Sequence, residues 1–194
     1  VSLELERELK NAGVCVETDS AVSHATYISD GVRLQTTSSR LIKTDAVIAA
    51  AGLRPNVALA EKAGIRVNKG IVVDNRMMTS AHNVFAIGDC AEIEGRVIAY
   101  LQPAILSASV LVKQITTGEG KLNLPHILTK VKTPNYPIQL AGRDIHTAKR
   151  WETQFAEQGI VAKGFNEAGQ LVGFVVTGEK TKTAFTLLKT LQTS

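Results

Sequence analysis

Gly88 and Asp89 are the residues whose types and spacing best suit chemistry on a bound organic molecule. They follow the apolar run Asn83 to Ile87, and Thr79 leads the whole segment. A glycine allows close backbone approach, and an aspartate at the carboxyl end of a buried strand can accept hydrogen bonds from sugar-like hydroxyls. A simpler interpretation is that Asp89 only caps the next segment, as aspartate often does.

A second candidate group lies at the start of a helix that we predict to begin at Pro103. Free N–H groups at a helix N-terminus favour an anion or an electron-rich carbonyl, so Leu101 and Gln102 are candidate donors. The alternative is that Tyr100 and Leu101 are core residues. Gly118 is expected to stop the helix, and its predicted buried stripe comprises Ile105, Ala108, Val112 and Ile115.

Gly52 ends the apolar run Ala46 to Ala51, which we predict to be a parallel strand covered on both faces. A Pro55-Asn56 turn follows this glycine. Such a strand and turn are ordinary in α/β proteins, so the value of this segment lies in its position before Gly88-Asp89.

The elements around these residues divide the chain into α/β and α+β parts. A helix ending at Gly13 opens the chain, and Asp30-Gly31 predicts a hairpin between segments 21–28 and 32–35. Strands are also predicted at 14–16, 71–74 and 83–87, and a helical turn at 59–63. Beyond residue 120 we predict antiparallel strands at 126–132, 138–141, 151–156, 160–165 and 171–177, then a covering helix at 181–191 that presents Phe185, Leu188 and Leu191 on one side.

Composition excludes several other classes of protein. The 194 residues are 44% hydrophobic and 21% charged, as in ordinary globular domains, and no apolar run reaches the roughly 18 residues of a membrane helix. Nothing indicates a signal peptide, and Cys15 and Cys90 lack a C-x-x-C spacing, so we expect a reducing cytoplasm, no metal site and no membrane or nucleic-acid partner. Residues 121–194 hold ten basic and five acidic side chains, which places the excess of positive charge there.

The segments Thr79 to Ala91 and Val47 to Asn56 together resemble the FAD-dependent pyridine nucleotide-disulfide oxidoreductases, most closely the NADH-dependent reductases of rubredoxin and flavorubredoxin, including the partner of bacterial nitric oxide reductase. The resemblance extends over Lys130 to Pro134 and Ala184 to Leu191. It implies partial FAD- and NAD-binding Rossmann-like domains at 1–54 and 55–119, and a small α+β, rubredoxin-binding-like domain at 120–194. No histidine precedes a proline, which argues against the glutathione reductase branch.

The resemblance also implies a role for each candidate residue. Asp89 would bind the ribityl chain of FAD, Gly88 would allow its approach, and Leu101 and Gln102 would face the pyrimidine edge of the flavin. Gly52, which we also expect to be a cofactor-binding residue, would lie where the chain leaves the nicotinamide domain. The parent protein would pass electrons from NADH through FAD to a rubredoxin-type iron protein such as flavorubredoxin, without a catalytic acid or base.

The chain departs from the family in having no G-x-G-x-x-G turn for either dinucleotide. We therefore expect a C-terminal fragment that is inactive alone. The alternative functions are a ferredoxin reductase, a component of an NADH nitrite reductase, or a non-catalytic interaction module. Lys130, Lys132, Lys149 and Arg150 are candidates for docking an acidic partner.

Overall fold

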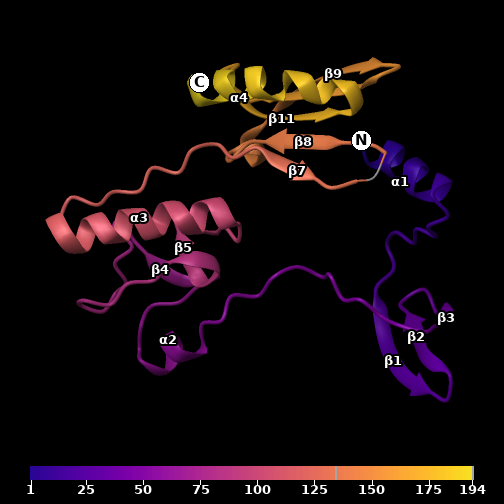
Figure 1. The fold of residues 1–194 in the computed structure, drawn as a ribbon, viewed down its shortest axis with the longest axis horizontal. Coiled ribbons are helices and arrows are strands. Elements are labelled where there is room, and N and C mark those ends of the chain that lie inside the picture. Colours follow the sequence, from indigo (N-terminus) through magenta and orange to yellow (C-terminus); the bar gives the residue numbers. More distant parts are fainter. Residues whose placement is uncertain (134, 194) are drawn as a thin grey trace. The chain divides into compact units, whose positions relative to one another are not determined.

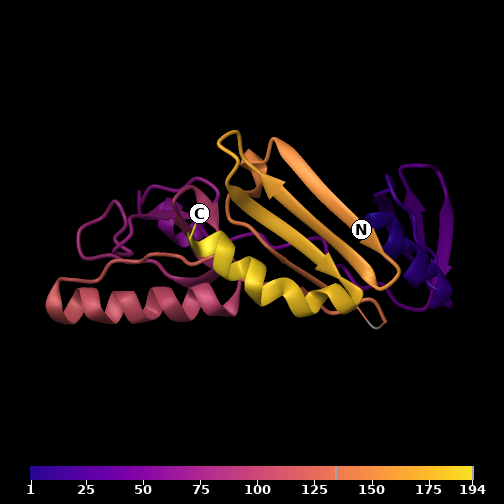
Figure 2. The same ribbon diagram turned by 90° about the horizontal axis from the view of Figure 1, so that it is seen from above.

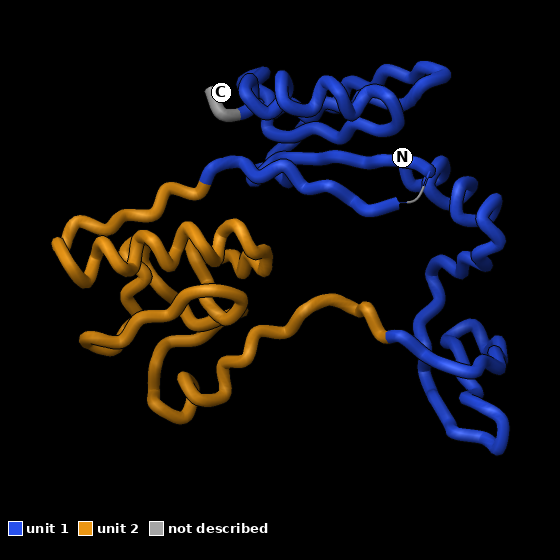
Figure 3. The backbone as a smooth tube through the Cα atoms, viewed as in Figure 1, with its two compact units in different colours: residues 1–48, 125–194 blue, residues 49–124 orange. Residues whose placement is uncertain are grey.

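The computed structural model describes residues 1–133 and 135–193, and it divides into two compact units, residues 1–48 with 125–194 and residues 49–124 (Figure 3). Pro134, which ends one of the segments that carry the resemblance, lies outside the described residues. Helices and sheets are mixed along the chain (Figure 1), which agrees with the predicted α/β class. In this part of the chain no helix is long and apolar enough to cross a membrane.

The first 48 residues form helix α1 (Ser2–Asn11) and the antiparallel strands β1 (Val22–Ile28), β2 (Gly31–Thr36) and β3 (Leu41–Thr44), in the order β1-β2-β3. Ile28 lies opposite Gly31 across the turn, which confirms the predicted hairpin. Gly31 has φ +130°, and a Cβ there would lie 2.4 Å from the carbonyl oxygen of Thr44, so only glycine fits. The strand predicted at 14–16 is absent, and β3 was not predicted.

Residues 49–124 form a small core beneath one long helix. Strands β4 (Ile71–Val73) and β5 (Ala91–Ile93) are parallel, and β6 (Arg96–Val97) pairs antiparallel with β5. Helix α2 (Ala58–Lys62) confirms the predicted helical turn, and α3 (Leu101–Thr117) is the long helix. Their core centres on Val73, Met77, Ala91 and Ile93, with Leu106 and Val110 of α3 packed against it.

Two further predicted strands were wrong. Residues 46–51 form no strand, and Ile48 is 93% exposed, because no described segment pairs with their backbone. Residues 83–87 make one isolated bridge, between Met78 and Phe85. An apolar run becomes a strand only where a neighbouring strand supplies hydrogen-bond partners.

The α3 prediction was partly correct. Gly118 ends the helix in the left-handed conformation with φ +73°, as expected. The helix begins at Leu101, so Pro103 is its third residue. The predicted stripe was wrong because α3 is apolar around much of its circumference: Ile105, Val112 and Ile115 are 56%, 62% and 65% exposed, whereas Leu106, Val110 and Leu111 pack inward.

The C-terminal residues form one five-stranded antiparallel sheet crossed obliquely by helix α4 (Figure 2). The strands, β7 (Thr129–Val131), β8 (Ile138–Ala141), β9 (Arg150–Ala156), β10 (Gly159–Phe165) and β11 (Leu171–Thr177), lie in the order β7-β8-β11-β10-β9. All five were predicted from the sequence. Short 3-10 turns occur at η2 (Ile145–Thr147) and at η3 (Gly178–Thr183), which leads into α4 (Ala184–Thr193).

Helix α4 covers the sheet through Ala184, Leu187, Leu188 and Leu191, which pack with Phe174 and Val176 of β11. The prediction that Leu188 and Leu191 are inward is confirmed. Phe185 is 63% exposed and does not share their inward side, whereas its neighbour Ala184 is buried against the sheet.

Candidate functional site

Gly88 and Asp89 lie in the 3-10 turn η1 (Gly88–Cys90), directly before β5. Gly88 has φ +75°, a conformation that favours glycine. The Asp89 side chain is exposed, and among the described residues it makes no hydrogen bond or ion pair. No side chain caps η1, so nothing supports a purely capping role for Asp89. Its carboxylate is available to accept hydrogen bonds from a ligand.

Thr79 shapes the loop that leads to this turn. Its hydroxyl donates a 2.9 Å hydrogen bond to the carbonyl oxygen of Val84 and accepts one of 3.1 Å from the amide of Ala81. The Ala86 amide also donates to the carbonyl oxygen of Met77 at 3.2 Å. These contacts fix the approach to Gly88, which explains why a threonine suits the head of this segment.

Helix α3, whose N-terminal residues include Leu101 and Gln102, contacts η1. The amides of Leu101 and Gln102 have no hydrogen-bond partner in the part of the chain that is described, and Tyr100 provides no side-chain cap. Pro103 has no N–H, and Ala104 is the first residue to bond within the helix, to the carbonyl oxygen of Tyr100 at 3.3 Å. Two free donors therefore stand at the positive end of a 17-residue helix dipole.

Leu101 and Gln102 are not core residues. The Leu101 side chain is 77% exposed and Tyr100 is 53% exposed. Gly88 and Asp89 therefore lie on η1, and Leu101 and Gln102 lie on α3, which contacts η1. Within the described part of the chain, this set offers one free acceptor, the Asp89 carboxylate, and two free donors, the amides of Leu101 and Gln102. That set can hold a ligand with both hydroxyl groups and electron-rich carbonyls.

Gly52 does not join this group. It is exposed in the extended segment before α2, with φ +96° and no atom within 4 Å of an added Cβ. No hydrogen bond among the described residues links it to η1 or α3. Its predicted proximity to a cofactor stays a prediction.

Comparison with known proteins identifies the framework that carries this site. The sequence model of the pyridine nucleotide-disulphide oxidoreductases matches residues 1–114, more than half of the chain. The chain belongs to this family. A second family, described as a rubredoxin binding C-terminal domain, matches residues 121–191.

Curated relatives in this family agree over nearly the whole chain. The nitric oxide reductase FlRd-NAD(+) reductase of Aliivibrio fischeri is 46% identical over all 194 residues, and that of Salmonella agona is 45% identical over 191. The chain spans about half the length of these relatives, 51% in both cases.

Solved structures share the fold. A ferredoxin reductase from Rhodopseudomonas palustris superimposes with a TM-score of 0.82 at 22% identity, over 95% of this chain and 47% of that one. NADH:rubredoxin oxidoreductase from Clostridium acetobutylicum gives 0.61 at 22% identity, over 75% and 38%.

Glu92, in the strand that follows η1, was not predicted from the sequence to support the site. It is 3% exposed in β5, and its carboxylate accepts hydrogen bonds from the Asn68 side chain (2.9 Å) and the amides of Lys69 (2.7 Å) and Gly70 (3.0 Å). Burial alone would raise the pKa of Glu92, but the hydrogen bonds from Gly70, Asn68 and Lys69 outweigh it and hold that pKa below its usual value. An acidic residue between Ala91 and Ile93 in a buried strand was the available signal.

The four candidate docking cations do not form one cluster. Lys130 lies in β7 and Arg150 in β9, which are the opposite edges of the sheet. Arg150 pairs with Glu152 at 2.6 Å and its guanidinium lies 5.1 Å from the centre of the Phe165 ring. The cationic side chains are therefore distributed around the domain.

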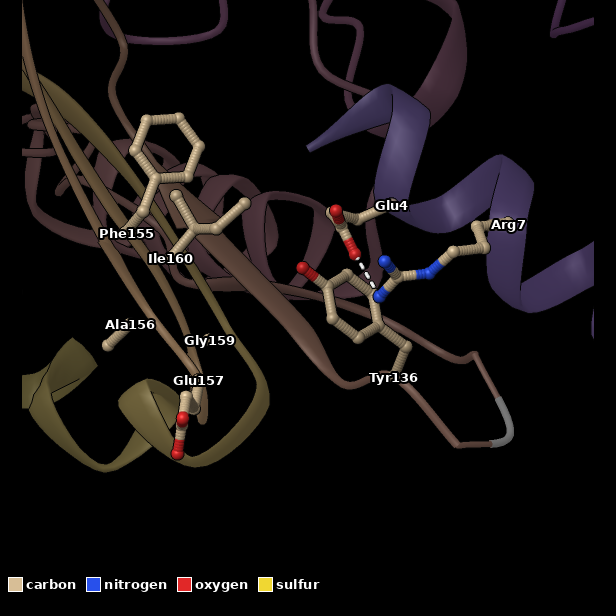
Figure 4. Close-up of a pocket in the computed structure, with 8 residues that line it drawn as sticks. All are labelled: Glu4, Arg7, Tyr136, Phe155, Ala156, Glu157, Gly159 and Ile160. Atoms are coloured by element: carbon tan, nitrogen blue, oxygen red, sulfur yellow. Dashed lines mark ion pairs between the residues drawn. The ribbon is translucent and has the colours of Figure 1, made fainter.

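A cavity within the first unit contains none of the residues predicted to bind a cofactor. This cavity, of about 470 Å³, is lined by the Glu4–Arg7 ion pair, Tyr136, Phe155 and Ile160 (Figure 4). In the described ranges no group of His, Cys, Asp and Glu side chains could hold a metal ion. Cys15 and Cys90 are free thiols.

Proposed function

We propose that this chain is the C-terminal part of a flavoprotein that passes electrons from NADH through FAD to a rubredoxin-type iron centre, such as that of a flavorubredoxin. The observation that carries the proposal is that, among the described residues, the Asp89 carboxylate and the amides at the start of α3 have no hydrogen-bond partner, and that they lie on two elements in contact. The family match, the rubredoxin-binding match at 121–191 and the names of the curated relatives support it.

The residues of the site fit the groups of FAD. The Asp89 carboxylate would accept hydrogen bonds from ribityl hydroxyls, and Gly88 would keep that approach free of a side chain. The amides of Leu101 and Gln102 would donate to an electron-rich carbonyl of the flavin and, with the α3 dipole, would stabilise negative charge there. FAD, when bound, would supply the hydride and electron-transfer chemistry, so no catalytic acid or base is assigned.

We divide the chain into residues 1–54 from the NAD-binding domain, 55–119 from the FAD-binding domain, and 120–194 as the domain that meets the iron protein. Gly52 stands at the first of these boundaries. Two free cysteines favour a reducing cytoplasm as the location. The fragment lacks a G-x-G-x-x-G turn and is proposed to be inactive without the rest of its parent.

The excess of basic side chains beyond residue 120 suits an acidic partner. Because Lys130 and Arg150 lie on opposite edges, the attraction acts through the field of the whole domain rather than through one patch. The rate at which the parent reduces its partner is then expected to fall as salt concentration rises. A rate independent of salt would remove this part of the proposal.

The choice of electron acceptor is tested with the full-length parent. Stopped-flow reduction by NADH should bleach a bound flavin, and reoxidation should be fast with rubredoxin or flavorubredoxin and slow with ferredoxin. Faster reoxidation by ferredoxin would favour a ferredoxin reductase. A colourless parent that does not oxidise NADH would indicate a non-catalytic interaction module.

A further inference from the structure

Strand β9 is an open edge of the C-terminal sheet. It pairs with β10 on one side, and no described segment pairs with its other side. All seven of its residues are exposed, including Trp151 (46%) and Phe155 (79%). An open edge with exposed aromatic side chains is a template for another strand.

The residues of β9 are complementary to themselves in one antiparallel register. Two copies related by a two-fold axis through Thr153 place Trp151 of each copy opposite Phe155 of the other. The same register places Lys149 opposite Glu157. Lys149 and Glu157 are exposed, and neither has an ion pair among the described residues. Aromatic pairs and opposite charges are the cross-strand contacts that stabilise sheets.

Neighbouring registers are worse, and so is the other edge of the sheet. In an antiparallel pair, opposite residues point to the same face of the sheet, so the two-fold axis must pass through a residue. An axis through Glu152 would place the two Glu152 carboxylates opposite each other. On the β7 edge, pairing about Val131 would oppose Lys130 and Lys132. Lysines on a short edge strand prevent pairing, so β7 is protected where β9 is not.

We infer that β9 is a self-association surface, at which a second copy of this chain adds its own β9 to make one continuous antiparallel sheet. The axis passes through Thr153, two Trp151–Phe155 pairs cover one face, and two Lys149–Glu157 pairs close the ends. This interface is isologous, as in most homodimers. It requires neither flavin nor an iron protein, so it stands independently of the proposed function.

Charge reversal tests the register in the 194-residue chain. Because each reversal creates two like-charge contacts, Lys149→Glu and Glu157→Lys should each raise the dimer dissociation constant about tenfold. The double variant restores opposite charges and should return that constant to near the original value. Sedimentation velocity across the micromolar range measures it, and circular dichroism verifies that each variant is folded.

Fluorescence provides a second readout, because Trp151 is the only tryptophan in the sequence. Its emission should shift to shorter wavelength as the chain concentration rises and the ring leaves water. Phe155→Ser should abolish that shift. Phe185→Ser removes a similarly exposed aromatic ring from α4 and should leave it unchanged.

Three results would overturn the inference. The chain could sediment as a monomer throughout the micromolar range, or single and double charge variants could associate equally. Alternatively, Trp151 emission could respond to an added acidic rubredoxin and not to chain concentration, with Glu157→Lys strengthening that response. The last result would assign the β9 edge to the iron protein.

Discussion

The carboxylate of Glu92 accepts a 2.9 Å hydrogen bond from the side-chain amide of Asn68, and this contact joins β5 to the loop before β4. The amides of Lys69 and Gly70 complete the set of donors. A Cβ at Gly70 would lie 2.8 Å from the carbonyl oxygen of Cys90, so the loop and η1 are packed closely. Glu92 thereby supports the turn that presents Asp89.

Replacing this carboxylate should destabilise the unit that carries the site. In Glu92→Gln, one of the two carboxylate oxygens becomes an NH2 group, which cannot accept a hydrogen bond from the donors that face it. We therefore expect a loss of about 2 kcal/mol in the free energy of unfolding at neutral pH. Urea denaturation of the chain measures it. Glu61→Gln, at an exposed position in α2 of the same unit, is the control.

The same substitution predicts a pH dependence. Because the folded-state pKa of Glu92 is lowered, its stabilisation is fully present above the ordinary value of 4.5 and is lost as pH falls through the lower folded value. The difference between wild type and Glu92→Gln should therefore shrink below pH 4.5. A difference that stays constant from pH 4.5 down to about pH 3 would contradict this assignment.

Gly159 and Gly169 offer a matched test of packing in the C-terminal sheet. Gly159 has φ +136°, and a Cβ there would lie 2.1 Å from the carbonyl oxygen of Thr177, whereas Gly169 has φ +76° with open space around it. Gly169→Ala should cost about 1 kcal/mol, through backbone strain alone. Gly159→Ala should cost more than about 3 kcal/mol, because backbone must move. Equal losses in thermal denaturation would show that the Thr177 contact is not restrictive.

These contacts also show what the sequence could predict. The five C-terminal strands and the Asp30-Gly31 hairpin follow from local alternation and turn residues, and their partners are close in the sequence. The predicted strands at 46–51 and 83–87 fail because a parallel strand depends on distant neighbours that local pattern does not reveal. The side of α3 that is buried was equally hidden, because both sides are apolar.

In the candidate site, too, the sequence pointed to some residues and not to others. Motif and helix signals in the sequence pointed to Gly88-Asp89 and to the start of α3, and the structure shows that η1 and α3 are in contact, while their role in binding a cofactor stays a prediction. Glu92 was not predicted, since its role depends on a loop 22 to 24 residues earlier in the chain. Gly52 lies in a recognisable sequence motif, but no hydrogen bond among the described residues links it to η1 or α3.

The amides at the start of α3 can be tested without unfolding the helix. Leu101 is the first helical residue and Tyr100 is extended, with φ −134° and ψ 153°, so proline is sterically acceptable at 101. In the full-length parent, Leu101→Pro removes one free donor and should lower the flavin reduction potential by about 30 mV, equivalent to about 1.4 kcal/mol for two electrons. Leu101→Ala keeps the amide and should leave the potential unchanged. Identical potentials in both variants would remove this amide from the site.

Asp89 tests the central claim most directly. The measurement is the ratio of bound FAD to protein in purified full-length Asp89→Ala, compared with wild type and with Glu61→Ala as a control for loss of another exposed carboxylate. Loss of the hydrogen bonds to the ribityl hydroxyls should weaken FAD binding about tenfold or more, so that the variant is purified largely without flavin. Full flavin occupancy in Asp89→Ala, with unchanged NADH oxidation, would contradict the proposed site.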